Sequence, residues 1–244
     1  MTARQAEWEY WSRLARSFDD ATRFLVGAET QRVLKDWLQA QIDPAHSVLE
    51  LGCGTGQFSE VIARGARQFI ASDGSAEMLA LARSKLEPFK NVTVRKEDCY
   101  CVSLPAGLFD TVFLGNVLHI VGDPALVLAE VHRLLKDGGK VIAIDSTASG
   151  LPWWLKLEMG VRYLLAFGPP PLTNRNMKPA QVAWMVHGAG FKVIDLALVG
   201  HESRAICLTA RKARSETAGR AVTVCGIENQ NQRAFERPSE RTES

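Results

Sequence analysis

Short apolar segments alternate with helical patterns through most of this chain of 244 residues. Continuous apolar runs predict strands at 47–51, 68–72, 92–95, 111–114 and 140–145, and helices are predicted at 57–64, 76–86 and 124–135. The glycine pair at 138–139 is expected to stop the third helix before the strand at 140–145. Strands alternating with helices of about ten residues form βαβ units, and runs without polar alternation fit strands buried on both faces. The alternation therefore predicts an α/β fold.

The last two predicted strands have a different connection. Strands at 191–199 and 204–210 follow a helix predicted at 179–187, and only four residues separate them. A link this short cannot cross over between parallel strands, so it predicts an antiparallel hairpin. The expected fold is a Rossmann-like, seven-stranded, mostly parallel sheet with an antiparallel terminal hairpin and helices on both faces.

The chain divides into three parts. Helical patterns at 5–24 and 29–42 predict an N-terminal helical cap over residues 1–43, and residues 44–212 form the sheet domain, with an insertion at about 151–178. From Ala213 onward Ser, Thr, Glu, Arg and Gln dominate, and the few apolar side chains cannot offset the entropy of ordering. We expect residues 213–244 to form a disordered tail.

Composition excludes several classes of protein. Lys and Arg number 29 and Asp and Glu number 27, so the net charge of +2 gives no electrostatic reason to expect nucleic-acid binding. Five cysteines in a chain of this length do not make a disulfide framework and indicate reduced thiols. The first residues lack the apolar segment of a secretory signal, so we expect a cytoplasmic location.

Three glycines follow the first predicted strand, in the sequence ELGCGTG at 50–56. Glycine lets the backbone adopt positive φ and approach a ligand closely, while the free N–H groups of the next helix face that ligand. The dinucleotide-binding fingerprint is GxGxxG, whereas the spacing here is GxGxG. The loop indicates a nucleotide-like ligand and by itself leaves a dinucleotide open.

Two acidic residues follow later strands. Asp73 comes at the end of the second strand, 21 residues after Gly52, where a carboxylate can accept hydrogen bonds from both hydroxyls of a ribose. Asp98 follows the third strand, where it could accept from an adenine amino group. Ligands of open α/β sheets bind beyond the carboxyl ends of the strands, so these residues predict a nucleoside site at that edge.

These motifs resemble the class I S-adenosylmethionine-dependent methyltransferases, and within them the small-molecule group (methyltransferase type 11) of the ubiquinone/menaquinone methyltransferases. The resemblance extends over about residues 6–212, and VLELGCGTG at 48–56 is its most specific motif. Four further stretches match: SDGSAEMLALAR at 72–83, EDCYCVSLPAGLFDTVFLGNVLHIV at 97–121, RLLKDGGKVIAID at 133–145 and HGAGFKVID at 187–195. The resemblance implies S-adenosyl-L-methionine as cofactor and methyl transfer to a small acceptor.

The resemblance also implies roles for residues around the methionine part of the cofactor. Gly52, Gly54 and Gly56 would lie beneath it. Glu50 would organise the glycine loop, and Asn116, at the end of the fourth strand, would face the sulfonium.

Further roles are implied around the adenosine part. Asp73 would bind the ribose, and Ser75 and Met78 would flank the adenine. Asp98 and Cys99 would meet the edge of the adenine. These five residues complete the cofactor-binding set that the resemblance implies.

The chemistry of methyl transfer suggests candidate catalytic residues. The reaction is an in-line displacement from a sulfonium, so the protein mainly aligns the reactants, and a phenol, carbon acid or amine can also need a base. His119, three residues after Asn116, is the candidate base, with structural packing as the alternative. Tyr10 and Trp11 are candidates for closing over the cofactor, where their rings would stabilise the cation. Packing of an amphipathic helix is the alternative for both.

Residues 151–171 are apolar and aromatic, and in the resembling family insertions at this point shape the acceptor pocket. Four aromatic side chains are expected to line a lipophilic site there: Trp153, Trp154, Tyr163 and Phe167. Three charged residues interrupt the run, which argues against a membrane span. A helix with weak membrane-surface contact is the alternative to a pocket helix.

Other interpretations have less support. Cys99 and Cys101 lack the second ligand pair of a zinc site, so we expect no metal. A nicotinamide-dependent oxidoreductase would need a catalytic Tyr and Lys at close helical spacing, and Tyr163 has no such lysine nearby. A non-catalytic partner protein that binds S-adenosylmethionine is another alternative, although the intact glycines and Asp73 argue against it. The (D/N)PP(Y/F) motif of adenine and glutamine methylation is absent after the fourth strand, so we expect no nucleic-acid substrate.

Overall fold

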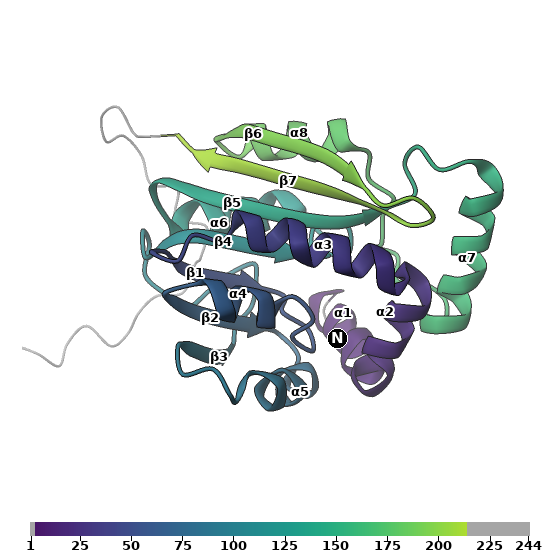
Figure 1. Cartoon of the computed structure of the whole chain (residues 1–244), viewed down its shortest axis with the longest axis horizontal. Coiled ribbons are helices and arrows are strands. Elements are labelled where there is room, and N and C mark those ends of the chain that lie inside the picture. Colours follow the sequence, from purple (N-terminus) through teal and green to yellow (C-terminus); the bar gives the residue numbers. More distant parts are fainter. Residues whose placement is uncertain (1–2, 214–244) are drawn as a thin grey trace, which may run out of the picture.

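The computed structural model describes residues 3–213, in which one seven-stranded sheet has the order β3-β2-β1-β4-β5-β7-β6 (Figure 1). The strands are β1 Ser47–Leu51, β2 Gln68–Asp73, β3 Val92–Lys96, β4 Phe109–Gly115, β5 Leu135–Thr147, β6 Phe191–Val199 and β7 Arg204–Lys212. Strands β1 to β5 pair in parallel, whereas β7 pairs antiparallel with both β5 and β6. The predicted fold class is confirmed. The tail predicted at 213–244 lies, apart from Ala213, outside the described residues.

Helices cover both faces of the sheet. One face carries α3 Ala28–Gln41, α4 Ser59–Gly65 and α5 Ala76–Leu86, and the other carries α6 Pro124–Leu134 and α8 Pro179–Gly188 (Figure 1). Alternate residues of β5 pack into the two apolar clusters that these layers form: Val141 and Ala143 into one, Ile142 and Ile144 into the other. This two-sided burial explains why the strand is a continuous apolar run.

Local signals set where α6 begins. The Asp123 carboxylate accepts hydrogen bonds from the backbone N–H groups of Ala125 and Leu126 at 3.0 and 3.3 Å, and Pro124 occupies the first helical position. A capping carboxylate satisfies otherwise free N–H groups, and proline needs no partner there. The helix therefore starts at Pro124, as predicted.

The helix predicted at 5–24 is interrupted. It forms α1 Ala3–Leu14, a 3₁₀ turn (η1, Ala15–Ser17) and α2 Phe18–Val26. Asp19, at the start of α2, accepts hydrogen bonds from Thr55 Oγ1 at 2.5 Å and from Lys85 Nζ. The turn thus directs α2 toward the glycine loop and α5. Because these contacts are tertiary, helical periodicity in the sequence could not predict the break.

The strand predicted at 140–145 is longer than expected. β5 begins at Leu135, directly after α6, and the glycine pair at 138–139 lies inside it. Between the pairs Phe109–Leu135 and Thr111–Lys140 the register with β4 shifts. Gly138 has a φ of +74°, a conformation that glycine adopts without strain, so the pair lets the chain bulge and rejoin the sheet instead of ending an element.

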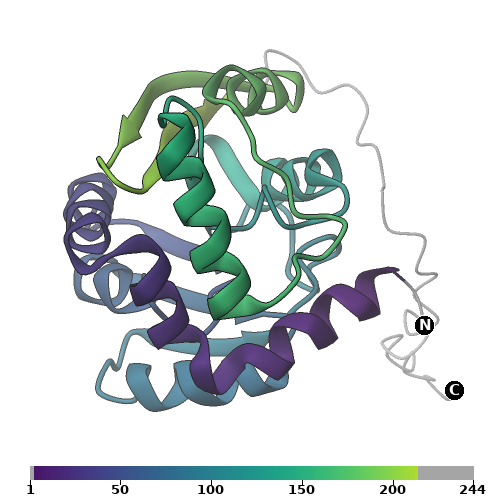
Figure 2. The ribbon, with the colours of Figure 1, turned by 90° about the vertical axis from the view of Figure 1, so that its right-hand side faces the viewer.

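Three helices lie across the carboxyl-end edge of the parallel strands. In Figure 2, α7 Trp153–Phe167 crosses the middle of the view, with α1 and α2 beside its lower end. Among residues 3–213, no helix combines the length and the apolar character that crossing a membrane requires. The three helices leave a space between themselves and the strand ends, and the candidate site occupies it.

Candidate active site

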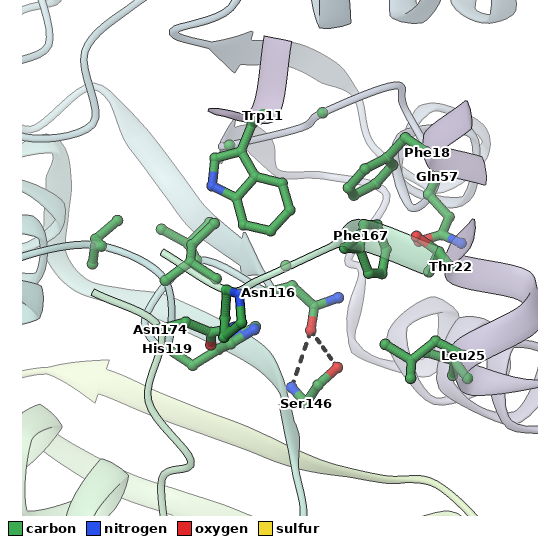
Figure 3. A pocket seen from close by; sticks show the side chains of 18 of the residues that line it. Trp11, Phe18, Thr22, Leu25, Gln57, Asn116, His119, Ser146, Phe167 and Asn174 are labelled. Carbon is green, nitrogen blue, oxygen red and sulfur yellow. Dashed lines mark hydrogen bonds between the residues drawn. The ribbon is translucent and has the colours of Figure 1, made fainter. Parts of the chain in front are cut away.

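A cavity of about 760 Å³ lies at the carboxyl ends of β1, β2, β4 and β5, beneath α1, α2 and α7 (Figure 3). Its wall includes most of the residues predicted to bind the cofactor, together with the predicted base: Glu50, Gly52, Gly54, Asp73, Ser75, Met78, Cys99, Asn116 and His119. Gly56, Asp98 and Tyr10 are not part of this wall in the described structure. A site at this edge is where ligands of open α/β sheets bind.

The glycine loop adopts the conformation that its sequence predicts. Gly52, Gly54 and Gly56 have φ values of +75°, +54° and +86°, which other residues rarely adopt. A Cβ on Gly52 would lie 2.6 Å from Val117 Cγ2, so a side chain there would clash with the β4 end. A Cβ on Gly56 would instead lie 3.5 Å from the backbone of Ala82 in α5. Gly56 therefore serves the packing of the loop on a helix, and the prediction that it faces the ligand is not supported by its position.

Asp73 organises the loop as well as lining the cavity. Its carboxylate accepts hydrogen bonds from the backbone N–H groups of Gly54 at 2.9 Å and Ser75 at 2.8 Å. Burial raises the pKa of Asp73, and these backbone donors oppose that effect. Ser75 caps α5 by accepting from the N–H of Met78 at 3.2 Å. One carboxylate thereby joins the ends of β1 and β2.

Glu50, at the end of β1, is a carboxyl group 1% exposed to solvent in the wall of the cavity. Ser59 Oγ donates a hydrogen bond of 2.6 Å to its Oε2. Desolvation raises the pKa of Glu50 to about 8, with a further contribution from the charge of Asp73. A ligand cation at this position would favour the ionised carboxylate, so the pair of acids suits a positively charged ligand.

Glu50→Gln is expected to remove a pH dependence of stability. The Glu50 carboxyl keeps its proton up to about pH 8 in the folded chain, whereas its ordinary pKa is 4.5. Because the folded state binds this proton more tightly, wild-type stability should fall as pH rises between these values, by at most about 1.4 kcal/mol per pH unit. Urea unfolding from pH 5.5 to pH 8 should show the variant gaining stability over wild type as pH rises. A constant difference between the two would contradict the assignment.

Asp98 has a role different from the predicted one. β3 ends at Lys96, and Asp98 lies in the turn that follows, where its Oδ1 accepts from the N–H of Tyr100 at 2.9 Å. Cys99 lines the cavity instead, and the buried side chain of Met78 is also part of the wall. The expected contact of Asp98 with an adenine edge is therefore not supported by its position, whereas Cys99 and Met78 lie in the cavity wall.

Asn116 has a strained backbone at the end of β4. Among the described residues it is the one non-glycine residue with positive φ, at 58°. Its Oδ1 accepts hydrogen bonds from the N–H and the Oγ of Ser146, at 3.0 and 2.8 Å (Figure 3). These bonds fix the orientation of the amide, so its NH₂ group is the end left to face a ligand.

His119 forms a pair with an acid that sequence reasoning missed. The Nδ1 atom lies 2.7 Å from Oδ1 of Asp145, and the backbone N–H of His119 donates to the same oxygen at 3.1 Å. Asp145, near the end of β5, is 1% exposed, and within the described part of the chain its Oδ2 has no hydrogen-bond partner. A carboxylate only accepts, so Nδ1 carries the hydrogen and Nε2 keeps its lone pair. The contact with Asp145 therefore holds the imidazole of His119 in one tautomer.

Aromatic rings form the wall that faces His119 and Asn116 across the cavity. Trp11, Phe18 and Phe167 meet at ring-centroid distances of 6.0 to 6.2 Å, and all three line the cavity (Figure 3). Tyr10 points elsewhere, because its hydroxyl donates to the carbonyl of Phe167 at 3.0 Å. It ties α1 to the end of α7, so its position supports a structural role and not the predicted catalytic one.

The insertion after β5 supplies two of the four aromatic residues predicted to line the site. Tyr163 and Phe167 line the cavity, and Asn174 donates to the Tyr163 hydroxyl at 3.0 Å. Trp153 and Trp154 do not line it and are 72% and 57% exposed. That part of the prediction is wrong, because the first turn of α7 extends beyond the cavity. Burial of the ring raises the pKa of Tyr163, which keeps its hydroxyl protonated.

Metal binding has no structural support among residues 3–213, where no group of three His, Cys, Asp or Glu side chains is arranged to hold an ion.

Cys53, inside the glycine loop, is buried, and burial raises the pKa of its thiol. Within the described part of the chain, the cavity therefore combines a glycine loop, two acids and a histidine.

Comparisons with known proteins agree with this geometry. Residues 49–143 match a family model described as a methyltransferase domain. The chain is 31% identical over 168 residues to a ubiquinone biosynthesis O-methyltransferase of Xanthomonas axonopodis pv. citri (strain 306), a match covering 66% of this chain and 70% of that protein. A demethylmenaquinone methyltransferase of Lactococcus lactis subsp. lactis (strain IL1403) is 33% identical over 111 residues, or 43% of this chain and 44% of that protein.

Solved structures share the fold. A SAM-dependent methyltransferase from Aquifex aeolicus superposes with a TM-score of 0.62 at 22% identity, covering 82% of this chain and 97% of that one. The sequence match to the Xanthomonas protein extends over 168 residues, far more than the length of the glycine loop. The chain belongs to the class I S-adenosylmethionine-dependent methyltransferases, enzymes that use S-adenosyl-L-methionine as methyl donor.

Proposed function

We propose that this methyltransferase transfers the methyl group to a hydroxyl of a small lipophilic aromatic acceptor of the quinol or phenol type. The observation that carries the proposal is His119, which pairs with Asp145 at 2.7 Å and lines a cavity whose wall is otherwise mostly aromatic and aliphatic. A phenolic oxygen must lose its proton to become a good nucleophile, and an apolar ring needs an apolar wall. The cavity supplies both requirements side by side.

The residues present fit S-adenosylmethionine. The positive-φ glycine loop lines the cavity at Gly52 and Gly54, and a Cβ on Gly54 would take up open space there, with Phe18 at 3.8 Å as its nearest neighbour. The two acids Glu50 and Asp73 line the same space. Asp73 would bind the ribose hydroxyls and Glu50 would balance the positive charge of the cofactor. The cofactor supplies a methyl group on a sulfonium, a good leaving group.

The adenine subsite lies on the β2 and β3 side of the cavity. Ser75 and Met78 at the start of α5 and Cys99 after β3 line this part and would enclose the adenine. On the opposite side, the fixed amide of Asn116 would face the sulfonium and the acceptor oxygen. The residues that would hold the cofactor therefore lie along the ends of the central strands.

In the acceptor subsite, His119 would take the phenolic proton through Nε2. Asp145 would act as a positioning residue, because it holds the imidazole in the required tautomer and stabilises the cation that forms. Trp11, Phe18 and Phe167 would contact the acceptor ring and exclude water. Alignment of oxygen and methyl group then supplies most of the acceleration.

The experiment that tests the proposal is a screen of quinols, phenols, thiols and lipid amines, scored by release of S-adenosylhomocysteine. We expect product release with lipophilic quinols or phenols, and little with thiols or amines of similar size. Binding of S-adenosylmethionine without any turnover across the screen would favour the non-catalytic alternative. Tight NADH binding in place of S-adenosylmethionine would overturn the proposed function.

A further inference from the structure

Along α7 runs a series of exposed apolar side chains, which we call the α7 face. It consists of residues spaced three or four apart along the helix, with one more after it, all at least 49% exposed: Trp153, Trp154, Leu157, Val161, Leu164, Leu165 and Leu172. In Figure 2 this helix lies across the side of the molecule that faces the viewer. Monomeric proteins rarely expose an apolar patch of this kind without a binding partner.

The α7 face continues into the cavity. Leu157, Val161 and Leu164 belong to the exposed face and also line the cavity wall. The route from the surface to the acceptor subsite is thus bordered by apolar side chains. A lipophilic acceptor could follow this route without passing through water.

The charges near the α7 face indicate what covers it. Between residues 151 and 178 there are four basic residues, Lys156, Arg162, Arg175 and Lys178, and one acid, Glu158, so the segment has a net charge of +3. A basic segment with tryptophans beside an apolar helix face is the pattern of helices that lie on anionic membranes. A symmetrical pairing of two copies through this face would bring the positive segments together. The charge pattern therefore favours a lipid surface over a second copy of the chain.

We propose that the α7 face docks on the surface of an anionic lipid bilayer, so that acceptor molecules enter the cavity directly from the lipid. The proposal rests on the proposed function for the nature of the acceptor, whereas docking itself can be measured without turnover. With 15 residues, α7 is too short to span the bilayer, so it would lie in the plane of the interface.

The test compares the double variant Trp153→Ser/Trp154→Ser with Trp184→Ser. Trp184, on α8, is 77% exposed and lies outside the α7 face, so it is a matched control. Flotation with vesicles of equal phosphatidylcholine and phosphatidylglycerol should recover wild type and the control. The fraction of the double variant bound to these vesicles should be lower by about tenfold or more, because two exposed rings no longer enter the interface. Vesicles of phosphatidylcholine alone should bind wild type less well than the mixed ones.

Two further measurements separate the outcomes. Turnover of a water-soluble phenol should be the same in the double variant as in wild type, because neither tryptophan lines the cavity. Failure of wild type to bind mixed vesicles while it methylates that phenol would overturn docking and leave the proposed function intact. Vesicle binding without methylation of any acceptor would instead overturn the proposed function alone. A dimer in sedimentation that the double variant abolishes, with no vesicle binding, would assign the face to a second copy.

Discussion

Replacing His119 by glutamine is expected to lower the rate of methyl transfer by about a hundredfold to ten-thousandfold while the affinity for S-adenosylmethionine stays unchanged. Glutamine retains a polar side chain of similar reach, but it cannot take a proton from a phenol. Single-turnover rates with a saturating phenolic acceptor measure the loss, and calorimetry measures cofactor binding. Asp145→Asn should lower the rate in the same direction, because an amide can donate to Nδ1 and favour the wrong tautomer.

His132→Gln is the matched control for the loss of an imidazole. His132, on α6, packs against the ring of Phe191 at a centroid distance of 5.3 Å and does not line the cavity. Its replacement should leave the single-turnover rate within about threefold of wild type. Full activity of folded His119→Gln would show that His119 has a structural role and does not act as the base.

Replacing Asp73 by alanine is expected to raise the dissociation constant of S-adenosylmethionine about a hundredfold or more. The variant would lose two charge-assisted hydrogen bonds to the ribose, each worth about 1.5–3 kcal/mol. It would also free the backbone N–H groups of Gly54 and Ser75, which the carboxylate now fixes at 2.9 and 2.8 Å. Calorimetric titration of the folded variant measures the change.

Asp110→Asn controls for the loss of a structural carboxylate on a strand. Asp110, near the opposite end of β4, accepts from the N–H and hydroxyl of Ser47, and its contact with Lys136 helps to lower the pKa of Asp110 to about 2. This variant is expected to lose stability without losing cofactor affinity. A dissociation constant for Asp73→Ala within threefold of wild type would contradict the ribose assignment.

Local patterns were sufficient to predict the sheet. Each strand contains apolar residues that mark it, and the four residues between β6 and β7 allow only a hairpin, so seven strands and the antiparallel edge follow from the sequence. The break in the first helix did not follow, because Asp19 bonds to Thr55 and Lys85, which are distant in the chain. The glycines at 138–139 were interpreted as the end of a helix. They lie instead in a bulge inside β5, which needs the same freedom of the backbone.

The candidate site was predicted in part. Asp73 could be placed because parallel strands end at one edge, whereas Glu50 and Asn116 were located through the family resemblance. Asp145 was missed, since it is 26 residues from His119 and only the pairing of β4 with β5 brings them together. That pairing is itself the signal that could have identified an acid at the end of β5. Helical periodicity could not show that Tyr10 and Trp153 point away from the cavity.

The most direct test of proton removal from an acceptor hydroxyl follows a labelled methyl group. The enzyme is incubated with methyl-labelled S-adenosylmethionine and one of two acceptors: a lipophilic hydroquinone, or the same ring with both hydroxyls blocked as methyl ethers. The account predicts that label enters the free hydroquinone as a methyl ether, in step with release of S-adenosylhomocysteine, and that the blocked ring stays unlabelled. Label on a ring carbon of either acceptor, or no transfer to the free hydroquinone, would contradict it.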